Sequence, residues 1–130
     1  MYDILVVGGG PAGLYVADRL ARAGRSVALF EEHPEIGLPV HCTGLLAAEA
    51  FTRFSLPHEA ILGEPRATRF RSSAGYELSY CAPSPQTVVV DRHRFDQGLA
   101  VQAAQAGVQL FLGARVARSH RHRGGLALTT

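Results

Sequence analysis

Three spaced glycines, Gly8, Gly10 and Gly13, lie between an aliphatic run and a segment with helical periodicity. In this pattern the first glycine permits a tight turn, the second lets the backbone approach a phosphate, and the third lets the helix pack close to the strand. A helix N-terminus binds an anion through its free N–H groups, and we expect the N–H of Ala12 to donate. The spacing predicts a pyrophosphate site of the dinucleotide-binding type.

An acidic residue, Glu31, ends the next aliphatic run after this motif. A carboxylate at that position accepts hydrogen bonds from the ribose hydroxyls of an adenosine and repels a 2′-phosphate. The sequence therefore predicts FAD or NAD and disfavours NADP. A glycine motif alone also occurs in ordinary tight turns, but here strand, helix, second strand and terminal acid all agree.

The elements that must position these residues form a β-α-β unit. Residues 3–7 predict a buried strand, and residues 26–30 predict a second one. Between them, Pro11 suits the first turn of a helix, and Gly24 suits the left-handed conformation that ends one. This order predicts an α/β fold with a parallel sheet.

The rest of the chain changes character, with turn residues and partial alternation of polar and apolar side chains. An extended loop over residues 33–44 is a candidate active-site element. Further elements are expected as follows: a helix over residues 45–54, a hairpin with arms at 66–72 and 76–81, a strand at 87–90, a helix capped by Asp91 and ending near residue 106, a strand at 108–112, and a final pair of arms at 115–121 and 126–130. The expected fold class is a Rossmann-like parallel sheet with β-hairpin insertions. The apolar final arm predicts that the sheet is incomplete at the C-terminus.

Composition restricts the class of protein. A chain of 130 residues with 47% apolar and 18% charged residues is typical of one compact globular domain. The net charge of +2 disfavours a nucleic-acid partner. The two cysteines, Cys42 and Cys81, lack CxxC spacing, so we expect neither a zinc site nor a disulfide framework. Without a bilayer-spanning run or a basic secretory signal, the predicted location is the cytoplasm.

The text VVGGGPAGL at residues 6–14, followed by LFEE at 29–32, resembles the FAD-binding start of the large two-domain flavoproteins. That family includes aromatic hydroxylases and isoprenoid reductases. Two later segments, EIGLPVHCTG at 35–44 and VDRHRFD at 90–96, resemble the geranylgeranyl reductase branch. The resemblance extends through essentially the whole chain, and the Cys42-Thr43-Gly44 loop is its most specific part.

The resemblance implies an FAD-dependent reductase that saturates isoprenoid double bonds, with NAD(P)H or ferredoxin as the external electron donor. A lipid substrate would bring such an enzyme to a membrane surface. Cys42 is the candidate catalytic residue, through substrate positioning or proton delivery. The implied cofactor contacts are Gly8, Gly10, Ala12, Gly13 and Glu31 at the ADP half, Cys42, Thr43 and Gly44 near the flavin, Arg92, and the backbone of Val116 at the adenine.

This sequence departs from the family pattern in one large way, so alternative functions are also considered. The later Gly-Asp motif and most of the substrate domain lie outside this sequence. Residues 1–130 are therefore interpreted as the N-terminal part of an FAD-binding domain, with residues 64–90 an antiparallel excursion toward a substrate domain. The alternatives are a flavin monooxygenase of the aromatic hydroxylase type and a non-catalytic nucleotide-binding fragment.

Overall fold

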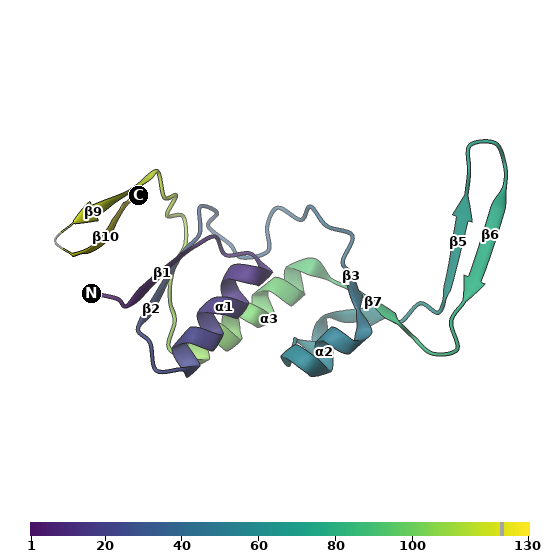
Figure 1. Cartoon of the computed structure of the whole chain (residues 1–130), viewed down its shortest axis with the longest axis horizontal. Coiled ribbons are helices and arrows are strands. Elements are labelled where there is room, and N and C mark those ends of the chain that lie inside the picture. The colour runs from purple at the N-terminus through teal and green to yellow at the C-terminus, as the bar shows by residue number, and fades with distance from the viewer. Residues whose placement is uncertain (123) are drawn as a thin grey trace. The chain divides into compact units, whose positions relative to one another are not determined.

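The computed structural model describes residues 1–122 and 124–130, which form two compact units (Figure 1). The first unit consists of Met1–Val40 and Asp96–Thr130, and the second consists of His41–Phe95. The order of elements in the first unit is strand, helix, strand at its start, as the sequence predicts.

A three-stranded parallel sheet forms the centre of the first unit. Its strands are β1 (Ile4–Val7), β2 (Val27–Phe30) and β8 (Gln109–Phe111), in the order β1-β2-β8. Val7 lies opposite Phe30, and Phe30 lies opposite Phe111. Because β2 has a neighbour on each side, its aliphatic residues 27–29 are buried. The sheet places the carboxyl ends of all three strands at one edge.

Helix α1 (Pro11–Arg22) connects β1 to β2. Its apolar face buries Leu14 and Ala17 completely. Gly24 has a φ of 81° and donates its N–H to the carbonyl of Ala21 at 2.9 Å, which ends the helix in the left-handed conformation. The predicted start and end of this helix are confirmed.

Helix α3 (Arg92–Gln105) precedes β8. Oδ1 of Asp91 accepts the N–H of Arg94 at 3.0 Å, which confirms the predicted cap. After β8 the chain forms an antiparallel pair, β9 (Arg118–His122) and β10 (Gly125–Thr129). The first arm was predicted from residue 115 and begins at Arg118. Between the arms, Arg123 lies outside the described residues.

The second unit contains an antiparallel sheet with the order β3-β7-β4. Its elements are β3 (Leu45–Ala47), α2 (Ala48–Phe54), the 3-10 helix η1 (His58–Ala60), β4 (Ile61–Gly63) and β7 (Thr87–Val90). The helix predicted from Leu45 begins only at Ala48, because Leu45–Ala47 pair with β7 instead. Phe51 is buried in this unit and packs near the rings of Phe95 and His58.

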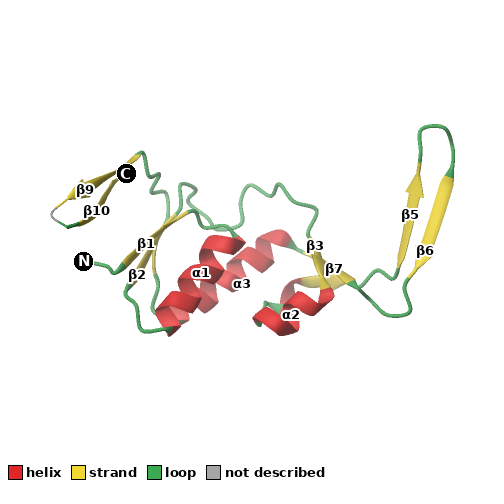
Figure 2. Cartoon of the chain, in the orientation of Figure 1, coloured by secondary structure: helices red, strands yellow, loops and turns green. Residues whose placement is uncertain are grey.

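An antiparallel hairpin of β5 (Ala67–Arg71) and β6 (Glu77–Cys81) completes the second unit (Figure 2). Phe70 lies opposite Leu78, and Arg71 pairs with Glu77 at 2.8 Å. The predicted α/β class, with a Rossmann-like sheet and hairpin insertions, is confirmed. The interpretation of residues 64–90 as an excursion toward a substrate domain stays a prediction. No helix in the described part of the chain is long and apolar enough to cross a membrane.

Candidate dinucleotide-binding site

The glycine loop begins where β1 ends. Gly8 has a φ of 103°, which a residue with a side chain rarely adopts, and its N–H donates to the carbonyl of Phe30 at 2.8 Å. Gly10 is the N-cap of α1, and its carbonyl accepts the N–H of Leu14 at 3.0 Å. The tight turn predicted for Gly8 is therefore present.

Gly13 and Gly10 differ in the space that surrounds them. A Cβ at Gly13 would collide with the carbonyl oxygen of Gly8, so the close approach of helix and strand requires glycine there. A Cβ at Gly10 would have no neighbour within 4 Å among the described residues. The backbone at Gly10 is thus open to a ligand, as a phosphate-binding loop requires.

The start of α1 is suited to an anion. The N-cap residue, Gly10, has no side chain to cap the helix, and the first turn carries no acidic residue. The first N–H groups of a helix have no partner within the helix, and the helix dipole adds a partial positive charge there. Ala12 lies in this exposed first turn. These features fit a pyrophosphate bound by backbone groups.

The backbone of Glu31 is held in place by hydrogen bonds. Its N–H donates to the carbonyl of Phe111 at 2.9 Å, and its carbonyl accepts the N–H of Ala114 at 2.8 Å. Its side chain is only 13% exposed, and Oε2 accepts the backbone N–H of Gly9 at 2.6 Å. The carboxylate thus lies against the glycine loop, where the sequence predicted a ribose contact.

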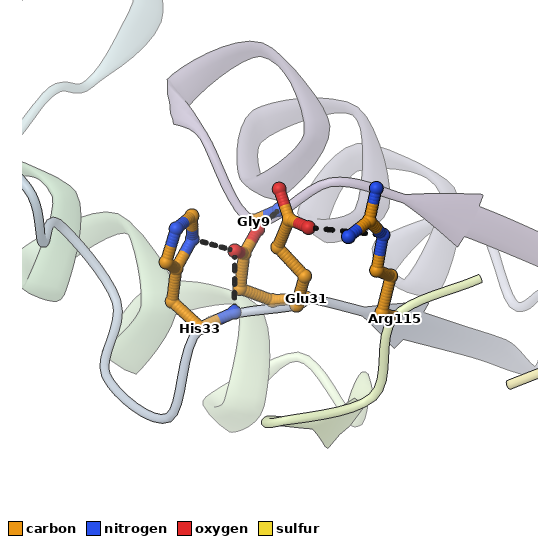
Figure 3. Close-up of polar contacts among 5 residues, drawn as sticks. Gly9, Glu31, His33 and Arg115 are labelled. Atoms are coloured by element: carbon orange, nitrogen blue, oxygen red, sulfur yellow. Dashed lines mark hydrogen bonds and ion pairs between the residues drawn. The ribbon is translucent and has the colours of Figure 1, made fainter. Parts of the chain in front are cut away.

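His33 is the second partner of this carboxylate (Figure 3). Oε1 of Glu31 accepts the His33 backbone N–H at 2.9 Å and lies 2.5 Å from the ring Nδ1. Burial raises the pKa of Glu31, but the hydrogen bonds from His33 and from the Gly9 N–H outweigh it, so the pKa is lowered below its ordinary value. Glu31 is accordingly ionised at neutral pH.

The sequence reasoning missed Gly9 and His33. Gly9 is buried, and a Cβ there would come within 2.5 Å of Cδ1 of Ile36 and 3.0 Å of Cβ of Glu31. The signal for Gly9 was present in the sequence, because it is the middle glycine of the run Gly8-Gly9-Gly10. The role of His33 had no such signal, because it depends on how the turn after Glu31 folds back.

Two further residues of the first unit border this network. Arg115 lies 3.5 Å from a carboxylate oxygen of Glu32, and both side chains are at least half exposed (Figure 3). Val116 follows in the loop between β8 and β9 and is half-buried. Its predicted backbone contact with adenine stays a prediction.

The remaining predicted residues come together in the second unit. Gly44 is buried with a φ of 75°, its carbonyl accepts the N–H of Val90 at 2.9 Å, and a Cβ there would lie 3.4 Å from Cγ of Arg92. Its own N–H donates to Sγ of Cys42 at 3.5 Å. Cys42 and Thr43 are exposed beside it. The structure thus groups Cys42, Thr43, Gly44 and Arg92, and their predicted roles stay predictions.

Both cysteines are exposed, and neither forms a disulfide with another described residue. Among residues 1–122 and 124–130, no group of three or more histidine, cysteine or acidic side chains is arranged to hold a metal ion. The candidate dinucleotide-binding site consists of the glycine loop, the start of α1 and the Glu31 carboxylate.

A family model described as an NAD(P)-binding Rossmann-like domain matches residues 6–70, which include the glycine loop, α1 and Glu31. The chain belongs to this family. The Rossmann-like chain is also 35% identical over 126 residues to a digeranylgeranylglycerophospholipid reductase of Methanoculleus marisnigri, an alignment that covers 88% of this chain and 30% of the relative. That relative confirms the resemblance to geranylgeranyl reductases.

Solved structures are also similar to this chain. A geranylgeranyl bacteriochlorophyll reductase-like protein from Thermoplasma acidophilum superimposes with a TM-score of 0.86 and 29% identity, covering 97% of this chain and 33% of that protein. A halogenase solved in complex with phloroglucinol and FAD superimposes with a TM-score of 0.70 at 16% identity, covering 98% and 31%, a likeness of fold alone. The Rossmann-like chain spans about a third of the length of these proteins.

Proposed function

We propose that this chain is the FAD-binding portion of a flavin-dependent reductase that saturates carbon–carbon double bonds of isoprenoid lipids. The observation that carries the proposal is the 35% identity to a digeranylgeranylglycerophospholipid reductase across 88% of the chain. That alignment is long enough to include residues from both compact units. The specific loop with Cys42 supports a reductase over a monooxygenase of the aromatic hydroxylase type.

The residues of the first unit bind the ADP half of FAD in this proposal. The open backbone at Gly10 and the first-turn N–H of Ala12 receive the pyrophosphate, so no basic side chain is needed there. The ionised carboxylate of Glu31 accepts hydrogen bonds from the ribose hydroxyls. A 2′-phosphate would be repelled by the same group, which supports FAD over NADP.

The residues of the second unit serve the flavin end and the substrate. When bound and reduced by the external donor, FAD would supply the hydride that reduces a double bond. The Gly44 turn holds Cys42 and Thr43 exposed, and Sγ of Cys42 holds the proton that the neighbouring carbon requires. Arg92 contacts the cofactor. In the first unit, the backbone of Val116 contacts the adenine.

The proposal extends to the setting of the whole protein. NAD(P)H or ferredoxin delivers the electrons, and the substrate is an isoprenoid lipid. The protein is cytoplasmic and contacts a membrane surface peripherally to reach that lipid.

The test is a flavin titration followed by a redox assay. The purified chain is titrated with FAD while the visible spectrum and the quenching of flavin fluorescence are recorded, and saturable binding is expected. In the full-length protein, flavin reduced under anaerobic conditions is expected to be reoxidised by a geranylgeranyl lipid. A colourless chain without affinity for FAD would support the non-catalytic fragment instead. Reoxidation only by oxygen with an aromatic substrate would support the monooxygenase.

A further inference from the structure

The Glu31 carboxylate has few free acceptor positions. A carboxylate offers about four lone-pair positions, two on each oxygen. On Oε1 both are used, by the backbone N–H of His33 at 2.9 Å and by its ring Nδ1 at 2.5 Å. On Oε2 one is used, by the N–H of Gly9 at 2.6 Å. With the donors of the described residues counted, one position is therefore open, whereas a ribose presents two hydroxyls.

The three donors differ in their freedom to move. Gly9 is buried against Ile36, so its N–H is fixed. The backbone of His33 is held because its carbonyl accepts the N–H of Gly113 at 3.0 Å. The imidazole, in contrast, is attached through rotatable bonds and its side chain is 44% exposed. It is the donor that can leave Oε1 without disturbing the backbone.

We infer that the His33 ring and a ribose hydroxyl compete for Oε1 of Glu31. When the ribose binds, the ring turns toward solvent and the hydroxyl takes its place. His33 is thus a positioning residue that acts through Glu31 and sets how easily this carboxylate accepts a ribose. The inference rests on the proposed function, because it requires a dinucleotide whose ribose contacts Glu31.

The groups around His33 leave the Glu31 carboxylate as the partner of its ring. Among the neighbouring charged residues, Glu32 pairs with Arg115 at 3.5 Å, and the carboxylate of Glu35 accepts from Gln97 at 3.2 Å. Glu31 is the acid that the ring contacts directly.

The experiment is a titration of the full chain with FAD at a single pH of about 7, followed by flavin fluorescence. Four proteins are compared: the unsubstituted chain, His33→Ala, His33→Phe and the control His120→Ala, which removes an exposed histidine of β9. Thermal unfolding followed by circular dichroism establishes that each is folded. The unsubstituted chain and the control are expected to bind FAD with equal affinity.

Both His33 variants are expected to bind FAD more tightly. His33→Ala removes the competitor, so its affinity for FAD is expected to exceed that of the unsubstituted chain by roughly threefold to tenfold. His33→Phe keeps a ring that cannot donate to Oε1, so its affinity is expected to rise by a similar factor. This second variant tests the inference if the alanine variant does not fold.

Three results would overturn the inference. Weaker binding by folded His33→Ala or His33→Phe would mean that the ring supports the ribose contact. Equal affinities in all four proteins would mean that the ring plays no part, while the proposed FAD site would stand. Failure of all four proteins to bind FAD would overturn both the inference and the proposed cofactor.

Discussion

The backbone N–H of Gly9 donates a 2.6 Å hydrogen bond to Oε2 of Glu31, so the glycine loop and the residue after β2 are joined through one carboxylate. The group proposed to bind the ribose therefore also holds the loop proposed to bind the pyrophosphate. A change at Glu31 affects both halves of the site.

Replacing Glu31 by glutamine is expected to weaken FAD binding about tenfold or more, because hydrogen bonds to a charged acceptor contribute roughly 1.5–3 kcal/mol. The measurement is the dissociation constant from flavin fluorescence. Glu32→Gln is the matched control, since the Glu32 side chain is half exposed and pairs with Arg115 instead. Equal dissociation constants for the two variants would contradict the assigned role of Glu31.

Alanine substitutions at Gly13 and Gly10 are expected to affect different properties: the stability of the fold at Gly13 and the affinity for FAD at Gly10. At Gly13 the new methyl collides with the carbonyl oxygen of Gly8, so the free energy of unfolding in urea should fall by roughly 1–3 kcal/mol. At Gly10, with a φ of −76°, the methyl meets open space, so stability should change by less than about 1 kcal/mol while FAD affinity falls. Normal FAD binding by Gly10→Ala would show that the pyrophosphate lies elsewhere.

The Asp3 carboxylate should make stability depend on acidity. The backbone N–H and the hydroxyl of Ser26 donate to it at 2.8 and 2.9 Å and lower its pKa. A lowered pKa gives stability that is present above the unfolded pKa of about 3.9 and is lost as the pH falls through the folded value. Asp3→Asn should therefore destabilise the chain in urea at pH 7 and have less effect at low pH.

The control for that experiment is Glu64→Gln, which changes an exposed acid between β4 and β5. Its urea midpoint should follow that of the unsubstituted chain across the same pH range. A constant difference between Asp3→Asn and the control at every pH would rule out the carboxylate as the cause.

Cys42→Ala in the full-length protein is expected to reduce turnover of an isoprenoid lipid about 100-fold, the usual contribution of a positioned proton donor. FAD binding should fall much less than turnover, because the residues proposed to bind the ADP half are unaltered. Cys81→Ala is the matched control, because Cys81 is also an exposed cysteine outside any disulfide of the described residues but lies on the hairpin strand β6. Normal turnover by Cys42→Ala would leave the thiol without a catalytic role.

The first β-α-β unit could be predicted from the sequence because every signal in it is local. Pro11 and Gly24 mark the two ends of α1, and the aliphatic runs mark the strands. The start of the second unit was different. Leu45–Ala47 reads equally well as the first turn of a helix, and only its pairing with the distant β7 makes it a strand. The three-residue β4, with its irregular pairing to β7, was missed for the same reason.

The site was predictable to a similar degree. The glycine spacing and the acid after β2 are sequence features, and the structure places both in one network. The contact of the His33 ring with Glu31 depends on the path of the turn between them. The buried position of Gly9 depends on Ile36, which lies in a loop whose path no periodicity describes.

The sheet order β1-β2-β8 has a consequence for the time at which the site forms during synthesis. The backbone of Glu31 is held by Phe111 and Ala114, which the ribosome adds long after residue 31. Contacts between residues so distant in sequence form slowly, because the intervening chain must first be brought together. A nascent chain that carries only β1, α1 and β2 therefore has the complete glycine motif but a Glu31 whose backbone is not yet held by Phe111 and Ala114. Under the proposed function, capture of FAD would be a late event that waits for β8.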